Sequence, residues 1–191
     1  MRHLVDMSPQ HFWTIFCEQA DSALRSGPDW HYAWKGGRKA WTHWFFPLLM
    51  TVFRHLGFRD CGSVQFEYSR IDVTLWRNPD TANFLVAVEH ENVWGEWLHE
   101  WTKLQTVDCA LRVVIGYEKT NSLEENLRRA EEIVREATAS LDRPSLLILF
   151  VGEGNAGDCF LAHHWDGKHL APLVGSVSLP AHGCRRCGQN S

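Results

Sequence analysis

The stretch FLVAVEHEN, residues 84–92, decides the fold prediction for this chain. Its first residues are small or branched and apolar, which is typical of a buried strand, yet the stretch continues into Glu89 and Glu91. Two carboxylates two residues apart on an extended chain point to the same side of a sheet. Like charges held so close are unfavourable unless a positive group lies between them. The stretch is therefore either a solvated strand end or half of a metal site.

Two helices are predicted before the strands. In residues 8–26 the apolar positions recur at helical spacing, with Ser8 as the candidate N-cap and Pro9 at the first helical position. A second helix is predicted over residues 40–56, where Pro47 either kinks or divides it. The N-terminal part of the chain is therefore expected to be helical.

From residue 64 onward the apolar spacing alternates between that of strands and that of helices. One strand is expected over residues 64–76, and a turn joins it to the strand at 84–90, so that the two form a hairpin. The later segments are a helix, a strand, a helix, a buried strand and a final edge strand, at residues 95–104, 109–117, 122–140, 145–152 and 159–165. Ser122 and Glu125 are spaced as a capping box for the second of these helices. This order predicts an α/β fold with a mixed central β-sheet flanked by helices.

The length of the chain favours a single domain. We expect this domain over residues 1–175 of the 191, followed by a flexible C-terminal tail at 176–191. HGCRRC, residues 182–187, offers at most three zinc ligands from Cys184, Cys187 and the nearby His. A flexible tail is therefore the expectation for this segment.

Charge and cysteine content limit the class of protein. A net charge of −4 excludes a protein coated in basic residues for non-specific nucleic-acid binding, but leaves a local basic face open. The first 20 residues do not resemble a secretory signal, and no run of about 20 apolar residues predicts a membrane span. With six scattered cysteines, the simplest expectation is a cytoplasmic protein with reduced thiols and no membrane partner.

An acid on the preceding strand adds to the pair in FLVAVEHEN. Asp72 lies across one turn from Glu89, and pairing of the two strands would bring it toward Glu89 and Glu91 on one sheet face. Converging carboxylates repel each other when empty and bind Mg²⁺ or Mn²⁺ when filled. Such an ion lowers the pKa of a bound water and neutralises charge on a phosphate that is being cleaved. The alternative is that these acids are exposed on the strand face and pair with Arg70 or Arg112.

The segments RID, residues 70–72, and FLVAVEHE, residues 84–91, resemble the core motif of the PD-(D/E)xK nuclease superfamily. That motif is an acid near the turn of a hairpin, followed by an apolar strand that carries (D/E)-x-K. The resemblance implies a restriction-endonuclease-like αβββαβ core over residues 8–152 and a nuclease activity that depends on Mg²⁺ or Mn²⁺. It also implies that Asp72 and Glu89 are metal-binding acids.

The chain departs from that motif at its third position, where Glu91 stands in place of the usual lysine. Some members of the superfamily carry Glu there and others move the lysine to the following helix, so Lys103 in EWTKL is a candidate substitute. Glu91 or Lys103 would then orient the attacking water or contact the scissile phosphate. A helix before the hairpin often contributes another acid in this superfamily, which makes Glu18 a candidate metal ligand. The carbonyl of His90 completes the candidate metal-binding set, while its ring is expected on the opposite face of the sheet.

Lys103 also has a purely structural interpretation, as a helix-surface cation that balances Glu96 and Glu100. Asn92 is expected to cap the helix that follows the strand. The sequence alone does not decide between the catalytic and the structural role of Lys103.

A basic and aromatic segment precedes the second helix. In WKGGRKAW, residues 34–41, Lys35, Arg38 and Lys39 can lie along a nucleic-acid backbone, while Trp30, Trp34 or Trp41 stacks on bases. The alternative is a solvated basic loop.

Together these patterns predict a metal-dependent nuclease that cuts phosphodiester bonds, in DNA more readily than in RNA. The small size of the chain implies a homodimer or a partner protein that supplies specificity. Two alternatives remain open: a catalytically inactive relative that binds nucleic acid or a protein, and an unrelated α/β protein whose acids are structural. The sheet face that Asp72 and Glu89 each occupy distinguishes the last of these from the others.

Overall fold

The computed structural model describes residues 6–26, 33, 36–58, 64–68, 70–76, 84–137, 143–152 and 158–179. Its helices are α1 (Pro9–Ser26), α3 (Arg38–His55), α4 (Trp97–Leu104) and α5 (Leu123–Glu136). Its strands are β1 (Val64–Tyr68), β2 (Ile71–Trp76), β3 (Phe84–Trp94), β4 (Cys109–Glu118), β5 (Ser145–Val151), β6 (Cys159–Trp165), β7 (Leu170–Pro172) and β8 (Val177–Ser178).

All the described strands belong to one mixed sheet, in the order β1-β2-β3-β4-β5-β6-β7, with β8 also paired to β6. The first three strands are antiparallel neighbours, whereas β3, β4 and β5 run parallel. Strands β6, β7 and β8 return to antiparallel pairing. The prediction of a mixed α/β sheet flanked by helices is confirmed.

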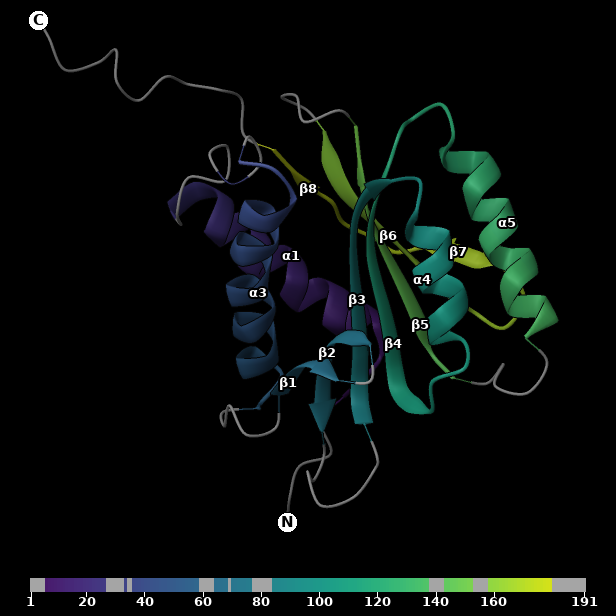
Figure 1. Ribbon diagram of the computed structural model, residues 1–191, viewed down its shortest axis with the longest axis horizontal. Helices are drawn as coiled ribbons and strands as arrows, with labels where there is room; N and C mark the ends of the chain where they lie inside the picture. The colour runs from purple at the N-terminus through teal and green to yellow at the C-terminus, as the bar shows by residue number, and fades with distance from the viewer. Residues whose placement is uncertain are drawn as a thin grey trace, which may run out of the picture.

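The helices cover the two faces of the sheet in pairs, α1 with α3 on one face and α4 with α5 on the other (Figure 1). The parallel pairs β3–β4 and β4–β5 each need a crossover helix, and right-handed crossovers place α4 and α5 on the same face. Aromatic side chains fill the α1/α3 layer, where Phe16 and Phe45 pack against Phe160 of the sheet. On the other face, Gly116 of β4 leaves room for Trp97, because a Cβ at Gly116 would lie 2.5 Å from the Cβ of Trp97.

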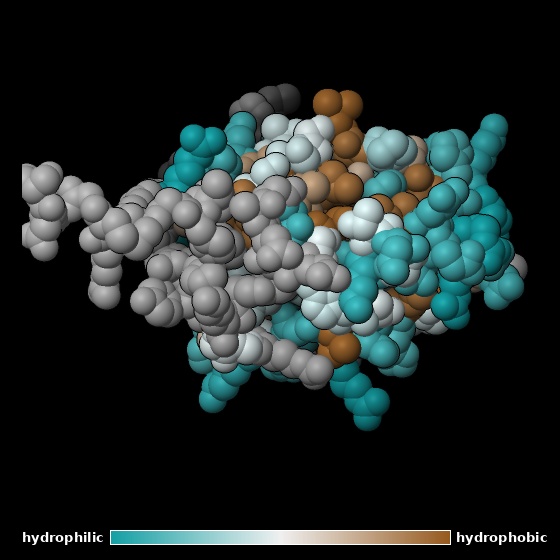
Figure 2. Space-filling view, turned by 90° about the horizontal axis from the view of Figure 1, so that it is seen from above, coloured by the Kyte–Doolittle hydropathy of each residue, from teal (hydrophilic) through white to brown (hydrophobic). Residues whose placement is uncertain are grey.

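The surface of α5 is strongly charged. Arg128 lies between Glu125 and Glu132 on this helix, and both carboxylates are in ion-pair contact with its guanidinium. Figure 2, a view from above, shows hydrophilic residues over the side where α5 lies and hydrophobic residues nearer the middle of that face. None of the helices within the described ranges combines the length and apolar character needed to cross a bilayer.

Several predicted elements are confirmed, including the first helix and its cap. The Ser8 side-chain oxygen accepts a hydrogen bond from the His11 backbone N–H at 3.2 Å, as an N-cap does. The second helix runs through Pro47 without a break from Arg38 to His55.

The prediction of one strand over residues 64–76 is wrong, because the chain reverses within it. Strands β1 and β2 pair antiparallel across a tight turn at Arg70, whose φ is 68°, and Glu67, within β1, also has a positive φ of 54°. Apolar and polar residues alternate within each strand, but the phase of the alternation changes at the polar pair Ser69-Arg70, where no Gly, Asn or Pro marks a turn. The hairpin between β2 and β3 was predicted correctly.

The limits of other elements also differ from the sequence expectation. β3 continues to Trp94, so Asn92 lies within the strand and its amide donates to Thr42 of α3 at 2.8 Å instead of capping α4. β6 is an interior strand, since β7 and β8 pair with its free side. β8 lies beyond residue 175, where the sequence placed the start of a tail, and residues 180–191 are outside the described part of the chain.

The capping box predicted for α5 is replaced by another arrangement. The Ser122 hydroxyl donates to Glu118 Oε1 at 2.6 Å, and Glu125 pairs with Arg128 instead of reaching back to Ser122. Glu118, at the end of β4, therefore takes over the role of holding the start of α5 in place.

Candidate functional site

The acids singled out in the sequence meet where β2, β3 and α4 come together. Val73 of β2 pairs with Val88 of β3, and continuing this antiparallel register sets Asp72 opposite Glu89. Opposite residues of an antiparallel pair share a sheet face, which here is the face covered by α4. The carboxylate of Asp72 accepts a hydrogen bond from the backbone N–H of His90 at 2.8 Å. The strand pairing predicted from the sequence thus brings Asp72 and Glu89 together.

Lys103, in the last turn of α4, completes this cluster. Its ammonium lies 2.7 Å from Glu89 Oε1, forms an ion pair with Glu100, and donates to the carbonyl of Arg70 at 2.9 Å. Only 2% of the Glu89 side chain is exposed, against 29% of the Lys103 side chain. The lysine therefore sits at the mouth of the cluster, against a buried acidic side chain. We call Asp72, Glu89, Glu100 and Lys103 the acid–lysine cluster.

Two acids of this cluster, Glu89 and Asp72, bind protons more tightly than free carboxyl side chains do. Burial raises the pKa of Glu89 to about 8, and the charges of Asp72 and Glu100 add to this effect, while its contact with the Lys103 ammonium opposes it. Burial also raises the pKa of Asp72, against the hydrogen bond from the His90 N–H. Burial would lower the pKa of Lys103, but its contacts with Glu100 and Glu89 raise it instead, so the ammonium stays charged.

The donor set of the cluster suits a hard divalent cation, because it consists of carboxylate oxygens. Oε1 of Glu89 and Oε2 of Glu100 are buried, and neither has a hydrogen-bond partner of ordinary geometry among the described residues. What faces both oxygens is the Lys103 ammonium at ion-pair distance. Across the described ranges, no three His, Cys, Asp or Glu side chains are already arranged to hold a metal ion. The acids thus fit Mg²⁺ or Mn²⁺ in chemistry, with Lys103 in the position of the cation.

Glu91 does not join the acid–lysine cluster. The pairing of β3 with β4 shifts register between His90 and Trp94, which interrupts the regular alternation of faces. The Glu91 carboxylate accepts from the Val93 N–H at 2.7 Å, and its charge acts on Tyr117. Among the charges that act on Glu89 are those of Asp72, Glu100 and Lys103, whereas the contacts of Glu91 are with Val93 and Tyr117.

His90 lies on the opposite face of the sheet from Glu89, as expected from the alternation of a strand. Its ring stacks on Phe45 of α3, and its Nε2 is 2.8 Å from the Tyr117 hydroxyl, which also accepts from the Trp41 indole. Burial lowers the pKa of His90 to about 3, so the ring is neutral near pH 7. Its contribution to the acid–lysine cluster is the backbone N–H that orients Asp72.

Two of the remaining candidate residues, Glu18 and Lys39, lie away from this cluster. Glu18 is exposed on α1, which covers the other face of the sheet (Figure 1). Lys39 is exposed on α3, on that same face, and the side chain of Arg38 is not described. Trp34 and Lys35 lie outside the described residues.

Two acids without an expected role in the site, Glu100 and Glu118, carry important contacts. Glu100 was expected only to balance the charge of Lys103. Its spacing of three residues from Lys103 on a helix was the feature that indicated a contact between the two side chains. Glu118 is 1% exposed and accepts hydrogen bonds from four donors, including the indole of Trp97 and the amide of Asn126. No spacing in the sequence marks Glu118, since its donors come from separate elements.

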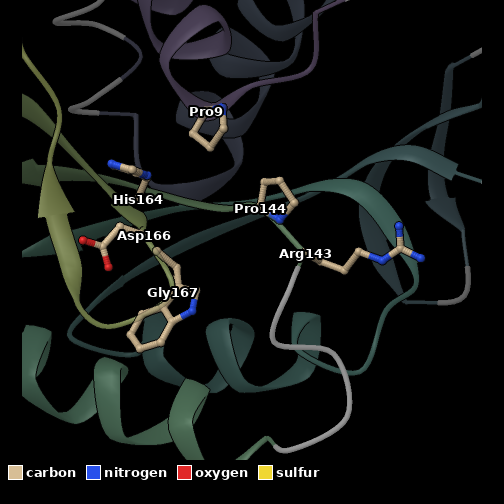
Figure 3. A pocket seen from close by; sticks show the side chains of 7 residues that line it. Pro9, Arg143, Pro144, His164, Asp166 and Gly167 are labelled. Atoms are coloured by element: carbon tan, nitrogen blue, oxygen red, sulfur yellow. The ribbon is translucent and has the colours of Figure 1, made fainter.

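A separate pocket of about 300 Å³ lies where the end of β6 meets the start of α1 (Figure 3). Its lining includes Pro9, Pro144, His164 and Trp165. Figure 3 shows the side chain of Arg143 extended away from Pro9 and His164, in keeping with its ion pair to Asp108 at 2.9 Å. None of the residues of the acid–lysine cluster lines this pocket.

The fold and the site define a mixed α/β protein with a buried acid–lysine cluster where the antiparallel part of the sheet meets its parallel part. Comparisons of the chain with protein-family models, with curated proteins and with solved structures gave no significant match. The geometry of the cluster therefore carries the functional interpretation.

The raised pKa of Glu89 predicts a pH dependence of stability. In the folded protein Glu89 keeps its proton up to a pKa of about 8, whereas the ordinary value is 4.5. Between these two pH values the folded state thus binds more protons than the unfolded state. The contribution of Glu89 to the free energy of unfolding is therefore complete below about pH 4.5 and is lost as pH rises through 8. We expect the free energy of unfolding to fall between pH 6.5 and pH 8.5 by more in the parent protein than in Glu89→Gln.

This comparison is measured by urea unfolding at the two pH values. The interval begins at 6.5 because His90, with its lowered pKa, destabilises the folded state only at more acidic pH. Equal pH dependence in the two proteins would contradict the assigned pKa shift.

Proposed function

We propose that the protein is a metal-dependent nuclease of the PD-(D/E)xK type, which hydrolyses phosphodiester bonds in DNA more readily than in RNA. The observation that carries the proposal is the position of Asp72 and Glu89 on neighbouring antiparallel strands, with Lys103 from the following helix against Glu89. A lysine at this place substitutes for the one that the motif lacks at Glu91.

The order of elements supports the same proposal. A helix, three antiparallel strands, a helix and a strand parallel to the third follow one another as α3, β1, β2, β3, α4 and β4. This succession agrees with a restriction-endonuclease-like αβββαβ core. Because β3 lies at the change from antiparallel to parallel pairing, its residues face both the hairpin and the crossover helix.

The roles of the residues follow from their contacts. Asp72 and Glu89 would hold Mg²⁺ or Mn²⁺, and when bound the ion supplies an acidified water and a counter-charge for the phosphate. The His90 N–H fixes the direction of the Asp72 carboxylate, and the neutral, buried ring behind it keeps that part of β3 in place. Lys103 supplies a positive charge at the mouth of the cluster for the scissile phosphate.

A catalytically inactive relative is the second candidate function. It is favoured by the double ion pair of Lys103, whose charge is already satisfied by Glu89 and Glu100. Such a protein would bind nucleic acid or a protein partner, and the basic segment that includes Lys39 is the candidate contact surface. A homodimer, or a partner that supplies specificity, remains part of both proposals. A cytoplasmic location also remains part of both, and the free thiols of Cys17, Cys109 and Cys159 suit it.

Metal binding tests the proposal most directly. We expect calorimetric titration of Mn²⁺ to show an affinity for Asp72→Asn at least about tenfold lower than for the parent, because a ligand oxygen loses its charge. The matched control is Asp108→Asn, which removes a mostly exposed carboxylate outside the cluster and leaves Mn²⁺ affinity unchanged. Absence of Mn²⁺ binding by the parent protein would contradict the proposal.

A further inference from the structure

The ammonium of Lys103 is held by oxygens from three separate segments. One is Glu89 Oε1 of β3, one is the carbonyl of Arg70 in the turn before β2, and one belongs to the Glu100 carboxylate of α4. Hard oxygen atoms converging on one positive charge are what a divalent cation also requires. Lys103 therefore occupies a place lined by the kind of oxygen atoms that a divalent cation would use.

We propose that Lys103 is an internal cation that competes with a divalent metal ion for the carboxylate of Glu89, so that metal binding and departure of the ammonium are one coupled event. This inference rests on the proposed function, because it takes Asp72 and Glu89 as the metal ligands.

Charge makes simultaneous occupation unfavourable. An ion bound between Asp72 and Glu89 would lie next to an ammonium that is itself 2.7 Å from Glu89 Oε1. Repulsion between two positive charges grows as their separation falls, and it is stronger around a carboxylate that is only 2% exposed than in water. Glu89 can therefore serve one of the two cations well, but not both.

The lysine can leave Glu89 without loss of all its partners. Glu100 lies three residues before Lys103 on the same helix, so this ion pair persists when the ammonium moves toward solvent. The helix itself stays in place, since Trp97, Trp101 and Leu104 are fully buried beneath it. Only the flexible four-carbon stem of a partly exposed side chain has to move.

Calorimetric titration with Mn²⁺ tests this competition in the parent, Lys103→Met and Lys119→Met. Lys119→Met removes the same charge from an exposed position after β4, so it controls for net charge. We expect Lys103→Met to bind Mn²⁺ roughly tenfold more tightly than the parent, as removal of one like-charge neighbour predicts, and Lys119→Met to bind it as the parent does. Equal, weaker or absent binding in folded Lys103→Met would overturn the proposal.

A measurement on the parent protein covers the case in which Lys103→Met does not fold. Addition of Mg²⁺ must change the NMR signal of the Lys103 side-chain nitrogen and leave that of Lys119 unchanged; an unchanged Lys103 signal also overturns the proposal. The binding and cleavage results together distinguish failure of this competition from failure of the nuclease proposal. Tighter Mn²⁺ binding by Lys103→Met without cleavage by any form keeps the competition and rejects the nuclease, whereas cleavage by the parent with unaltered affinity in Lys103→Met does the reverse.

Discussion

Glu89→Gln is expected to lower the rate of nucleic-acid cleavage by about a hundredfold or more while the protein stays folded. Loss of a preorganised charge that acts on the transition state commonly costs a factor of this size. The substitution removes the charge of Glu89 but keeps the shape of a side chain that is only 2% exposed. Since the pKa of Glu89 is raised to about 8, its carboxyl in the metal-free protein is already protonated in part at neutral pH, and Gln resembles that form.

The assay uses plasmid, linear and single-stranded DNA and RNA, each with Mg²⁺ or Mn²⁺ and with EDTA as a blank. Glu96→Gln is the matched control, because Glu96 is an exposed acid at the start of α4. Cleavage that persists in Glu89→Gln would belong to another site or to a contaminant. A parent protein that cleaves none of these substrates would favour the inactive alternative.

Glu118→Ala is expected to destabilise the fold by about 3 kcal/mol or more. Glu118 accepts hydrogen bonds from the Trp97 indole, the Lys119 N–H, the Ser122 hydroxyl and the Asn126 amide, at 2.6–2.9 Å. Hydrogen bonds to a charged group stabilise by roughly 1.5–3 kcal/mol each, and a buried donor left without an acceptor adds its own cost. The substitution therefore loosens α4 and α5 at the end of β4 together.

Urea unfolding of the parent, Glu118→Ala and Glu118→Gln measures this effect. The amide of Gln keeps one acceptor oxygen, so an intermediate loss is expected. Glu124→Ala removes an exposed acid in the first turn of α5 and is expected to cost less than about 1 kcal/mol. A midpoint for Glu118→Ala equal to that of the parent would contradict the structural role of this carboxylate.

Much of the fold follows from local patterns in the sequence. Apolar spacing predicted α1, α4 and the buried strands β4 and β5, because each buries one face or all of its side chains. The β1–β2 reversal was not predicted, since it occurs at Arg70 with a positive φ, where no Gly or Asn marks a turn. An interior position for β6 depends on β7 and β8, which are too short to show a period.

The candidate site also contains residues whose positions followed from the sequence and residues whose positions did not. Asp72 and Glu89 were expected on one face because pairing of the two strands of a hairpin brings residues of neighbouring strands together. The same argument did not hold for Glu91. A register irregularity after His90 interrupts the regular alternation of faces on which the argument depends. Lys103 was a candidate with two interpretations, and its contact with Glu89 required α4 to pack against β3.

By itself, the sequence determined the alternation of helices and strands and the acids that end a buried strand, because these depend on neighbours along the chain. Only the tertiary structure decided that the ammonium of Lys103 lies between Glu89 and Glu100, and that Glu118 joins α4 to α5. Those contacts connect elements whose approach is set by packing on the sheet, so no spacing within one segment encodes them.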